Sequence, residues 1–328
     1  MRVFLTGATG LIGSHTVEEL TRAGHEVVAL CRADADTRFL DRIPCTVVRG
    51  DVRSGAETLV PLVEGCQRLV HAAAQVYVGG SWPRVREVNV DGTRNVLTAA
   101  RLAGIEHVVH LSTVAVYGPV EGSIDESQPI DEPLAPTDLY ARSKREAEEV
   151  VRGIEERRGL PVTVLRPSAV YGERDRLMAP ALARLLRLPV VALLGPGTNT
   201  LPVVYAGNVA VAVRLAVEKA VGGETYNVAM DHPLTQRELF EGLAAGMGRT
   251  PRFVVIPPNV ARTGGEILGR FGVSAPGAKH LPLQRVVALG LAPNPFRSER
   301  IRRELGWRPP HAHPEALERT GRWLVSAS

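Results

Sequence analysis

The 328-residue chain has the composition of a folded globular protein, with 45% hydrophobic and 23% charged residues, which excludes a disordered chain and accommodates two domains. Its net charge is +4, but 35 acidic residues are mixed among 39 basic ones, which argues against a nucleic-acid-binding groove. Cys31, Cys45 and Cys66 have neither zinc-site nor disulfide spacing, which fits a reducing, cytoplasmic compartment. The N-terminal segment is too short and glycine-rich for a signal peptide. No apolar run reaches the roughly 18 residues of a membrane span, so we expect no membrane partner.

Short β-branched runs alternate with longer helical patterns through the first half of the chain. Strands are predicted at Arg2–Thr6, Glu26–Cys31, Thr46–Arg49, Arg68–His71, His107–Leu111 and Val162–Leu165. Apolar residues at helical spacing predict helices at Ile12–Ala23, Val90–Ala103 and Tyr140–Arg158. This alternation predicts an α/β fold, a doubly wound parallel sheet with helices on both faces. Ligands of such sheets bind at the carboxyl ends of the strands.

The character of the sequence changes after Pro167, where proline and glycine become frequent and strand signals sparse. A smaller, irregular second lobe is therefore expected. The run Gly223–Met230 has the pattern of one more sheet strand. The predicted division is a first domain over residues 1–166, to which the chain returns at about 203–230, and a second lobe over 167–202 and 231–328.

Three glycines at three-residue intervals follow the first predicted strand directly. Such glycines permit a tight turn, let a pyrophosphate approach the backbone and let the next helix pack closely on the strand. The start of that helix offers free N–H groups to negative charge. The position after an N-terminal strand favours a dinucleotide site over a structural turn. The residues expected to contact the dinucleotide here are Gly7, Thr9, Gly10, Leu11, Ile12 and Gly13.

The end of the second strand should select between NAD and NADP, because an acidic residue there binds the adenosine 2′-hydroxyl. This strand ends instead in Cys31-Arg32. A guanidinium can pair with a 2′-phosphate, so NADP is favoured over NAD. Arg38 is a second phosphate candidate. In the alternative interpretation Arg32 is a solvated charge and Asp34 contacts the hydroxyl.

Two further strand ends continue the predicted cofactor site. After the third strand, Asp51 can accept a hydrogen bond from the adenine amino group, with Val52 beside it. After the fourth strand, the small residues Ala72, Ala73 and Ala74 allow the cofactor to lie against the backbone. In series, these positions trace one dinucleotide across the sheet.

Proton chemistry is predicted for Tyr140 and Lys144, because residues four apart lie on one face of a helix. A neighbouring cation favours the phenolate and brings the pKa of a tyrosine toward the working range. Ser112-Thr113 ends the fifth strand, where a hydroxyl can polarise a reacting oxygen. Thr113 is predicted for that role, with Ser112 as the second choice.

Together these motifs resemble the extended short-chain dehydrogenases/reductases, which include sugar-nucleotide epimerases and dehydratases, dihydroflavonol-type reductases and 3β-hydroxysteroid dehydrogenases. The resemblance covers essentially the whole chain. It runs through Thr6-Gly7, Asn89-Val90-Asp91-Gly92-Thr93, Ser112-Thr113, Tyr140 with Lys144, Arg166-Pro167-Ser168 and Glu304-Leu305-Gly306-Trp307-Arg308-Pro309. It implies a Rossmann fold, a support for the active-site helix at Asn89 and a ribose contact at Lys144. It also implies that Pro167 and Ser168 line the nicotinamide, and that the protein is a homodimer.

Two departures from the sugar-nucleotide members concern the substrate. Sugar-nucleotide 4,6-dehydratases carry an Asp-Glu pair after the active-site threonine, whereas this chain has Val114-Ala115. Epimerases commonly clamp the substrate diphosphate with an arginine, and the corresponding segment here begins with Leu201. Arg174, Arg176 or Arg297 could replace that clamp from another direction.

The sequence therefore predicts an NADP-dependent carbonyl reductase or alcohol dehydrogenase that acts on a small, relatively apolar molecule in the second, substrate-binding lobe. The alternative is a nucleotide-sugar epimerase that retains tightly bound NAD. A third hypothesis is a non-catalytic cofactor sensor, which would be expected to lack Tyr140 or Lys144. No metal site is predicted, because His311 and His313 lie beside prolines in what is expected to be a surface loop.

Overall fold

The computed structural model describes residues 1–76, 81–229, 232–270, 274–275, 278–282, 287, 290–291 and 293–326. The chain forms two compact units. Unit 1 comprises Met1–Ser168, Gly207–Ala229 and Phe296–Arg308, and unit 2 comprises Ala169–Ala206, Met230–Pro295 and Pro309–Ser328. Met230, the end of one predicted strand, lies outside the described residues.

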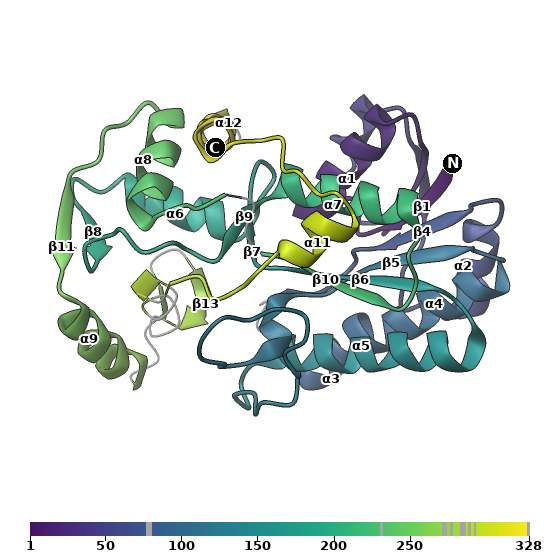
Figure 1. Ribbon diagram of the computed structural model, residues 1–328. Helices are drawn as coiled ribbons and strands as arrows, with labels where there is room; N and C mark the ends of the chain where they lie inside the picture. Colours follow the sequence, from purple (N-terminus) through teal and green to yellow (C-terminus); the bar gives the residue numbers. More distant parts are fainter. Residues whose placement is uncertain are drawn as a thin grey trace. The chain divides into compact units, whose positions relative to one another are not determined.

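The described part of unit 1 contains a seven-stranded sheet in the order β10-β6-β5-β4-β1-β2-β3 (Figure 1). All of its neighbouring strands are parallel. The strands are β1 (Arg2–Thr6), β2 (Glu26–Cys31), β3 (Thr46–Arg49), β4 (Arg68–His71), β5 (His107–Leu111), β6 (Val162–Pro167) and β10 (Glu224–Val228). The predicted doubly wound sheet is confirmed, and the strand predicted near residue 223 is its edge strand.

Helices cover both faces of this sheet, with α1 and α7 on one face and α4 and α5 on the other (Figure 1). The helices of unit 1 are α1 (Leu11–Arg22), α2 (Ala56–Val63), α3 (Trp82–Arg86), α4 (Gly92–Leu102), α5 (Leu139–Arg158), α7 (Ala206–Lys219) and α11 (Glu299–Glu304), with short turns η1 (Leu40–Arg42) and η3 (Val114–Tyr117). The helix predicted from Val90 differs, because a π-helical turn, η2 (Glu87–Asp91), precedes α4. The core on this side combines apolar residues of the sheet with those of α2, α4 and α5.

The segment Phe296–Arg308 belongs to unit 1, although the sequence-based division assigned it to the second lobe. Trp307 is fully buried, and its indole N–H donates to the carbonyl of Asn208 at 2.9 Å. Phe296 forms an isolated parallel bridge with Ile124. These contacts join the segment to elements about 100 to 170 residues earlier in the chain, so local sequence patterns could not reveal them.

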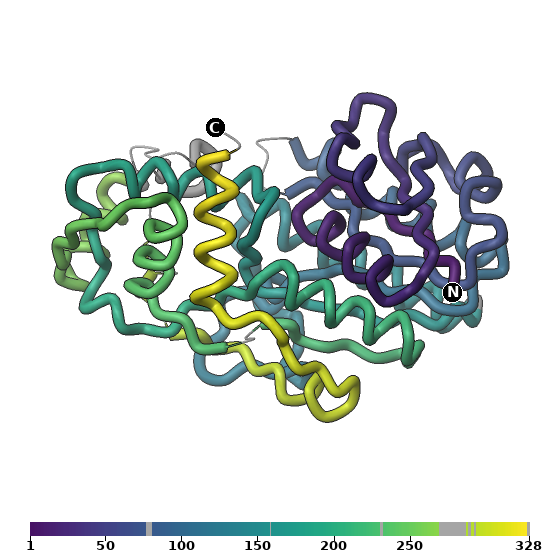
Figure 2. The backbone as a smooth tube through the Cα atoms, turned by 90° about the horizontal axis from the view of Figure 1, so that it is seen from above, coloured from purple at the N-terminus to yellow at the C-terminus, as the bar shows by residue number. Residues whose placement is uncertain are grey.

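Unit 2 contains helices packed on short strands. Its elements are β7 (Ala169–Tyr171), α6 (Met178–Leu186), β8 (Val191–Leu194), β9 (Val203–Tyr205), α8 (Gln236–Gly246), β11 (Phe253–Ile256), α9 (Pro258–Arg270), β12 (Ser274–Ala275), β13 (Ala278–Pro282) and α12 (His313–Ser326). Figure 2 shows α12 running beside α8. A Cβ on Gly246 would lie 2.2 Å from the Glu318 carbonyl oxygen, so glycine permits this close crossing.

We expect Trp307→Ala to lower the free energy of unfolding by about 3–5 kcal/mol, because it empties a large buried volume. Trp307→Phe should cost clearly less, since it keeps most of the ring volume and loses mainly the hydrogen bond to Asn208. Urea denaturation followed by circular dichroism measures both variants. An alanine variant as stable as the wild type would contradict the anchoring role.

Candidate functional site

The turn between β1 and α1 has no space for a side chain at Gly7 or at Gly13. Gly7 has φ +77°, and a Cβ on it would lie 2.6 Å from the backbone of Ala72 and Ala73. A Cβ on Gly13 would lie 2.1 Å from the Gly7 carbonyl oxygen. Helix α1 then begins with Gly10 as its N-cap, without a side-chain cap and without an acidic residue in its first turn. This bare helix start fits a pyrophosphate, which needs close backbone approach and free N–H donors.

Arg32 and Arg38, the residues predicted to select between NAD and NADP, lie after the end of β2 and before β3. The Arg32 guanidinium lies 3.3 Å from the Asp34 carboxylate, and both side chains are mostly exposed. Arg38 is exposed and paired with Asp36 at 2.7 Å. A 2′-phosphate would therefore compete with an existing carboxylate for either arginine.

Asp51 and Val52, which follow β3, make different kinds of contact. Asp51 accepts hydrogen bonds from the Arg53 side chain, which lower the pKa of its carboxyl group, so it is an acceptor at neutral pH. Val52 is buried against α4, where a Cβ on Gly92 would lie 2.9 Å from its Cγ2 atom. The Asn95 side chain donates to the Val52 carbonyl at 3.0 Å, so Val52 fixes this strand end to the helix.

Helix α5 carries both residues predicted for proton chemistry. The side chain of Asp138 caps the helix by accepting from the Ala141 N–H at 3.1 Å, which places half-buried Tyr140 in the first turn. Lys144 follows one turn later and is 3% exposed. Its ammonium donates to the Leu111 carbonyl at the end of β5, at 2.7 Å. Burial lowers the pKa of Lys144 to about 8, although the Glu148 carboxylate opposes the shift.

Ser112 and Thr113 follow β5 directly and use their hydroxyls differently. The Ser112 hydroxyl donates to the Glu148 carboxylate at 2.5 Å. Thr113 is buried, and its hydroxyl oxygen accepts from the Ala115 N–H at 3.2 Å, so it caps η3. The Ser112 hydroxyl proton is therefore used in a hydrogen bond to the buried Glu148. The Thr113 hydroxyl acts as an acceptor in the bond from Ala115.

A buried ion pair that the sequence analysis did not predict lies behind these residues. Arg166 donates to the Glu148 carboxylate at 2.6 and 3.0 Å, and both side chains are at most 6% exposed. Arg166 also donates to the Tyr117 hydroxyl, which donates to the Asn227 side chain, both at 2.9 Å. Glu148 is thus buried, although helix α5 carries many charged residues after Lys144. The position of Glu148 one turn after Lys144 was the available signal.

Pro167 ends β6, and Ser168 follows it. The Ser168 hydroxyl donates to the Ala229 carbonyl at 3.0 Å, and its N–H donates to the Val228 carbonyl at 3.3 Å. Ser168 is 6% exposed. Its polar groups therefore connect the ends of β6 and β10.

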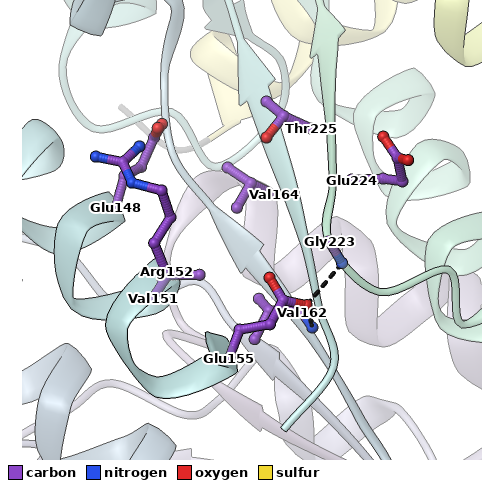
Figure 3. A pocket seen from close by; sticks show the side chains of 9 residues that line it. All are labelled: Glu148, Val151, Arg152, Glu155, Val162, Val164, Gly223, Glu224 and Thr225. Carbon is purple, nitrogen blue, oxygen red and sulfur yellow. Dashed lines mark hydrogen bonds between the residues drawn. The ribbon is translucent and has the colours of Figure 1, made fainter. Parts of the chain in front are cut away.

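A cavity of about 100 Å³ opens between α5, β6 and β10 (Figure 3). Its described lining residues are Glu148, Val151, Arg152, Glu155, Val162, Val164, Gly223, Glu224 and Thr225. The Glu155 carboxylate accepts from the Gly223 N–H at 2.6 Å and from the Val162 N–H at 3.0 Å. The volume is well below the roughly 300 Å³ at which small-molecule sites begin, and the lining includes no predicted cofactor or catalytic residue. We assign this cavity no ligand.

The described residues contain no group of three His, Cys, Asp or Glu side chains that could hold a metal ion. His313 is not in a surface loop. It is 3% exposed at the start of α12, and its ring is hydrogen-bonded to the Tyr171 hydroxyl at 2.7 Å. No helix within the described ranges is long and apolar enough to cross a membrane.

Comparison with known proteins identifies the relatives of this chain. Residues 3–229 match the model of the NAD dependent epimerase/dehydratase family. The chain is 30% identical to a 2-alkyl-3-oxoalkanoate reductase of Stenotrophomonas maltophilia (strain K279a), over 97% of this chain and 98% of that protein. It is also 30% identical to a 4-hydroxy-2-methyl-3-oxo-4-farnesyl-3,4-dihydroquinoline-1-oxide ketoreductase of Stigmatella aurantiaca, over 97% and 95% of the two chains.

A solved structure with the same fold is the dTDP-glucose 4,6-dehydratase DesIV of Streptomyces venezuelae, which contains NAD. It is 28% identical, with a TM-score of 0.76 over 99% of this chain and 97% of that chain. The family thus includes reductases and dehydratases that act on small molecules. This chain belongs to the NAD-dependent epimerase/dehydratase family and is an NAD(P)-dependent enzyme of the extended short-chain dehydrogenase/reductase type.

Proposed function

We propose that the protein is an NADP-dependent carbonyl reductase, or an alcohol dehydrogenase in the reverse direction, for a relatively apolar substrate. The observation that carries this proposal is the apolar character of two positions at which sugar-nucleotide enzymes of this type use charged residues. Those positions are Leu201 and the pair Val114-Ala115.

Leu201 stands where epimerases commonly have their diphosphate-binding arginine. It is 8% exposed and packs in the hydrophobic core of unit 2 with Val203 and Tyr205. A leucine in such a core supplies no charge to a diphosphate. This supports a substrate without a nucleotide diphosphate.

Val114 stands where the 4,6-dehydratases have an acidic residue. It is 7% exposed and belongs to an apolar cluster with Tyr117, Ile124 and Ala229. Neither Val114 nor Ala115 can exchange a proton, so the acid and base of the dehydratase reaction are missing from this turn.

The names of the two relatives that cover nearly the whole chain indicate the same kind of substrate. One reduces a 2-alkyl-3-oxoalkanoate, and the other is a ketoreductase for a farnesylated quinoline. Both names combine a carbonyl group with a hydrocarbon group, an alkyl group in one and a farnesyl group in the other. By analogy, we propose a ketone that carries an extended apolar group as the substrate of this enzyme.

The proposed roles of the site residues follow from their positions. The dinucleotide, when bound, supplies the hydride. The backbone of Gly7, Gly10 and Gly13 admits its pyrophosphate, while Tyr140 donates the proton to the carbonyl oxygen and Thr113 hydrogen-bonds that oxygen. Lys144, held by the Leu111 carbonyl, provides the positive charge that favours the phenolate of Tyr140 and contacts the ribose.

We propose that further residues around the glycine turn and the strand ends contact the cofactor. They are Thr9, Leu11, Ile12, Arg32, Arg38, Asp51, Val52, Ala72, Ala73, Ala74, Pro167 and Ser168. We propose a homodimer in a reducing, cytoplasmic environment, which fits the free thiols of Cys31, Cys45 and Cys66. Light scattering on the purified protein would return a monomer mass if the dimer proposal is wrong.

One experiment separates the proposed reductase from its alternatives. One sample of the purified protein is denatured, and any nucleotide that it releases is identified. A second, native sample is assayed with NADPH or NADH and a 2-alkyl-3-oxoalkanoate, and separately with UDP-glucose. NADPH oxidation that depends on the oxo acid supports the reductase. Retained NAD with inversion of the sugar and no net NADH supports the epimerase. Binding of a dinucleotide without turnover of any carbonyl compound or sugar nucleotide in a broad panel supports a cofactor sensor.

We expect Tyr140→Phe to retain dinucleotide affinity and to lose most turnover, by about 100-fold or more, because the proton donor is missing. Tyr226→Phe is the matched control, since its hydroxyl bonds to Glu304 at 3.0 Å and has no proposed part in the reaction. Steady-state kinetics and NADPH titration measure both variants. Comparable turnover in the two variants would remove Tyr140 from the mechanism.

We expect Lys144→Met to stabilise the ligand-free protein at pH 7, by on the order of 1–3 kcal/mol. The pKa of Lys144 in the folded protein, about 8, lies below its ordinary value of 10.5 because of burial. Burial of the charged lysine therefore lowers the free energy of unfolding by its full amount below pH 8. This destabilisation decreases as the pH rises from 8 to 10.5. The gain in the variant should shrink over the same range in denaturation experiments. A gain that does not change with pH would contradict the burial of a charged lysine.

The same variant should bind NADPH more weakly than the wild type if Lys144 contacts the ribose. Affinity equal to that of the wild type would contradict this contact while leaving the stability argument intact.

We expect Arg32→Asp to shift the affinity ratio from NADPH toward NADH by about 10-fold or more, because it replaces a phosphate partner with a hydroxyl acceptor. Arg22→Asp makes the same change in charge at the far end of α1, where Arg22 pairs with Glu19. Titration with both dinucleotides compares the variants. Equal ratios in the two variants would make Arg32 an ordinary surface residue.

A further inference from the structure

A chain of buried hydrogen bonds, which passes through the backbone and the side chain of Asn89, runs from the glycine turn to the helix of Tyr140. Its members are Thr6, His71, Thr93, Asn89 and Ser143, which come from β1, β4, α4, η2 and α5. Of these, only Asn89 has an expected role from the family resemblance. Each of the five side chains is at most 1% exposed.

The first half of the chain starts beside Gly7. Thr6 and His71 are paired across β1 and β4, and the Thr6 hydroxyl lies 2.7 Å from Nδ1 of His71. The Ala73 N–H donates to the same hydroxyl oxygen at 3.2 Å. Ala73 is also the residue whose backbone closes on Gly7. The chain therefore begins at the wall of the glycine turn.

The second half ends at the first turn of α5. The Thr93 hydroxyl donates to the Asn89 carbonyl at 2.6 Å. The Asn89 side chain donates to the Ser143 hydroxyl at 2.8 Å, and that hydroxyl donates to the Tyr140 carbonyl at 2.8 Å. The Asn89 side chain also accepts from the Gln75 N–H at 2.7 Å, so it holds the strand extension and the helix together.

The number of available protons fixes the direction of the two hydrogen bonds of the His71 ring. The single hydroxyl proton of Thr93 is used on the Asn89 carbonyl, so Nε2 of His71, which lies 3.0 Å from that hydroxyl, must be the donor. A neutral ring with a proton on Nε2 leaves Nδ1 as an acceptor for Thr6. Burial, with a smaller contribution from Lys144, lowers the pKa of His71 to about 3, so the ring is neutral at physiological pH.

A neighbouring histidine does not extend the chain. The ring of His110 lies 5.4 Å from that of His71, centroid to centroid, but neither of its nitrogens has a hydrogen-bond partner within the described residues. Of these two histidines, His71 is therefore the one that joins the two halves of the hydrogen-bonded chain.

We propose that His71 and Thr93 are positioning residues for the reaction, because they hold the dinucleotide-binding turn in register with the start of the helix that presents Tyr140. Neither residue contacts the reacting groups in this proposal. It rests on the proposed function, since it assumes that the dinucleotide lies at the glycine turn and that Tyr140 carries the proton.

The chain contains a matched control for this proposal. His107 and Thr163 form a second buried histidine–threonine pair, with Nε2 of His107 2.9 Å from the threonine hydroxyl. The Thr163 hydroxyl donates to the Val221 carbonyl at 2.6 Å, as that of Thr93 donates to Asn89. This pair connects β5 and β6 at the ends of the strands opposite to the glycine turn, so Thr163→Val loses the same bonds without cutting the chain.

We expect Thr93→Val to weaken NADPH binding and to lower turnover by about fivefold each, the factor that corresponds to one lost hydrogen bond. Thr163→Val should keep NADPH affinity and turnover within about twofold of the wild type, even if its melting temperature falls as far as that of Thr93→Val. NADPH fluorescence titration and steady-state assay measure the two variants. Equal effects in the two variants would overturn the proposal, whereas a wild-type protein that binds no dinucleotide would refute the proposed function itself.

Two further measurements test the connection independently of stability. The double variant Thr6→Val/Thr93→Val should lose less NADPH affinity than the product of the single losses, because either change already breaks the chain. Losses that multiply would overturn the proposal. The ¹⁵N shifts of His71 should report a proton on Nε2 and none on Nδ1 in the wild type. The opposite tautomer would contradict the direction of the chain.

Discussion

The ammonium group of Lys144 is held inside unit 1, where it is 3% exposed and bound to the carbonyl of Leu111. A buried charge is unfavourable unless the surrounding structure supplies compensating dipoles and charges. Here the compensation comes from the end of β5 and from the Glu148 carboxylate, which opposes the lowering of the lysine pKa by burial. The position of β5 inside the parallel sheet, between β6 and β4, determines where this ammonium can lie, and the proposed chemistry of Tyr140 depends on it.

Two systems of buried hydrogen bonds fix the strand ends around this lysine. One is charged and joins Ser112, Glu148 and Arg166 behind the fifth strand. The other is neutral and passes through His71 and Thr93 between the first strand and α5. Buried polar groups that find partners hold a single arrangement, because any displacement leaves a donor or acceptor unsatisfied in a medium of low dielectric. The site is thus positioned by groups that need not touch a ligand.

The same scaffold serves different reactions within the family, so the fold alone does not determine the substrate. In this chain the apolar residues Val114 and Leu201 pack into local hydrophobic clusters. By the sequence resemblance, they correspond to positions at which sugar-nucleotide enzymes of this type carry charged groups. The proposed preference for an apolar ketone comes from this loss of charge, while the backbone geometry of the glycine turn fits a dinucleotide independently of the substrate.

The sequence alone determined the elements whose signals are local. Six of the seven strands of the parallel sheet follow from β-branched runs in the first half of the chain. The glycine turn follows from its spacing, and the placement of Tyr140 and Lys144 one turn apart on α5 follows from the period of a helix. The tertiary structure decided which distant groups meet. Glu148 and Arg166 are 18 residues apart, Asn89 and Ser143 are 54 apart, and Asn208 and Trp307 are 99 apart. No local periodicity in the sequence predicts these pairs, because each pair depends on the strand order and on how the helices pack across the sheet.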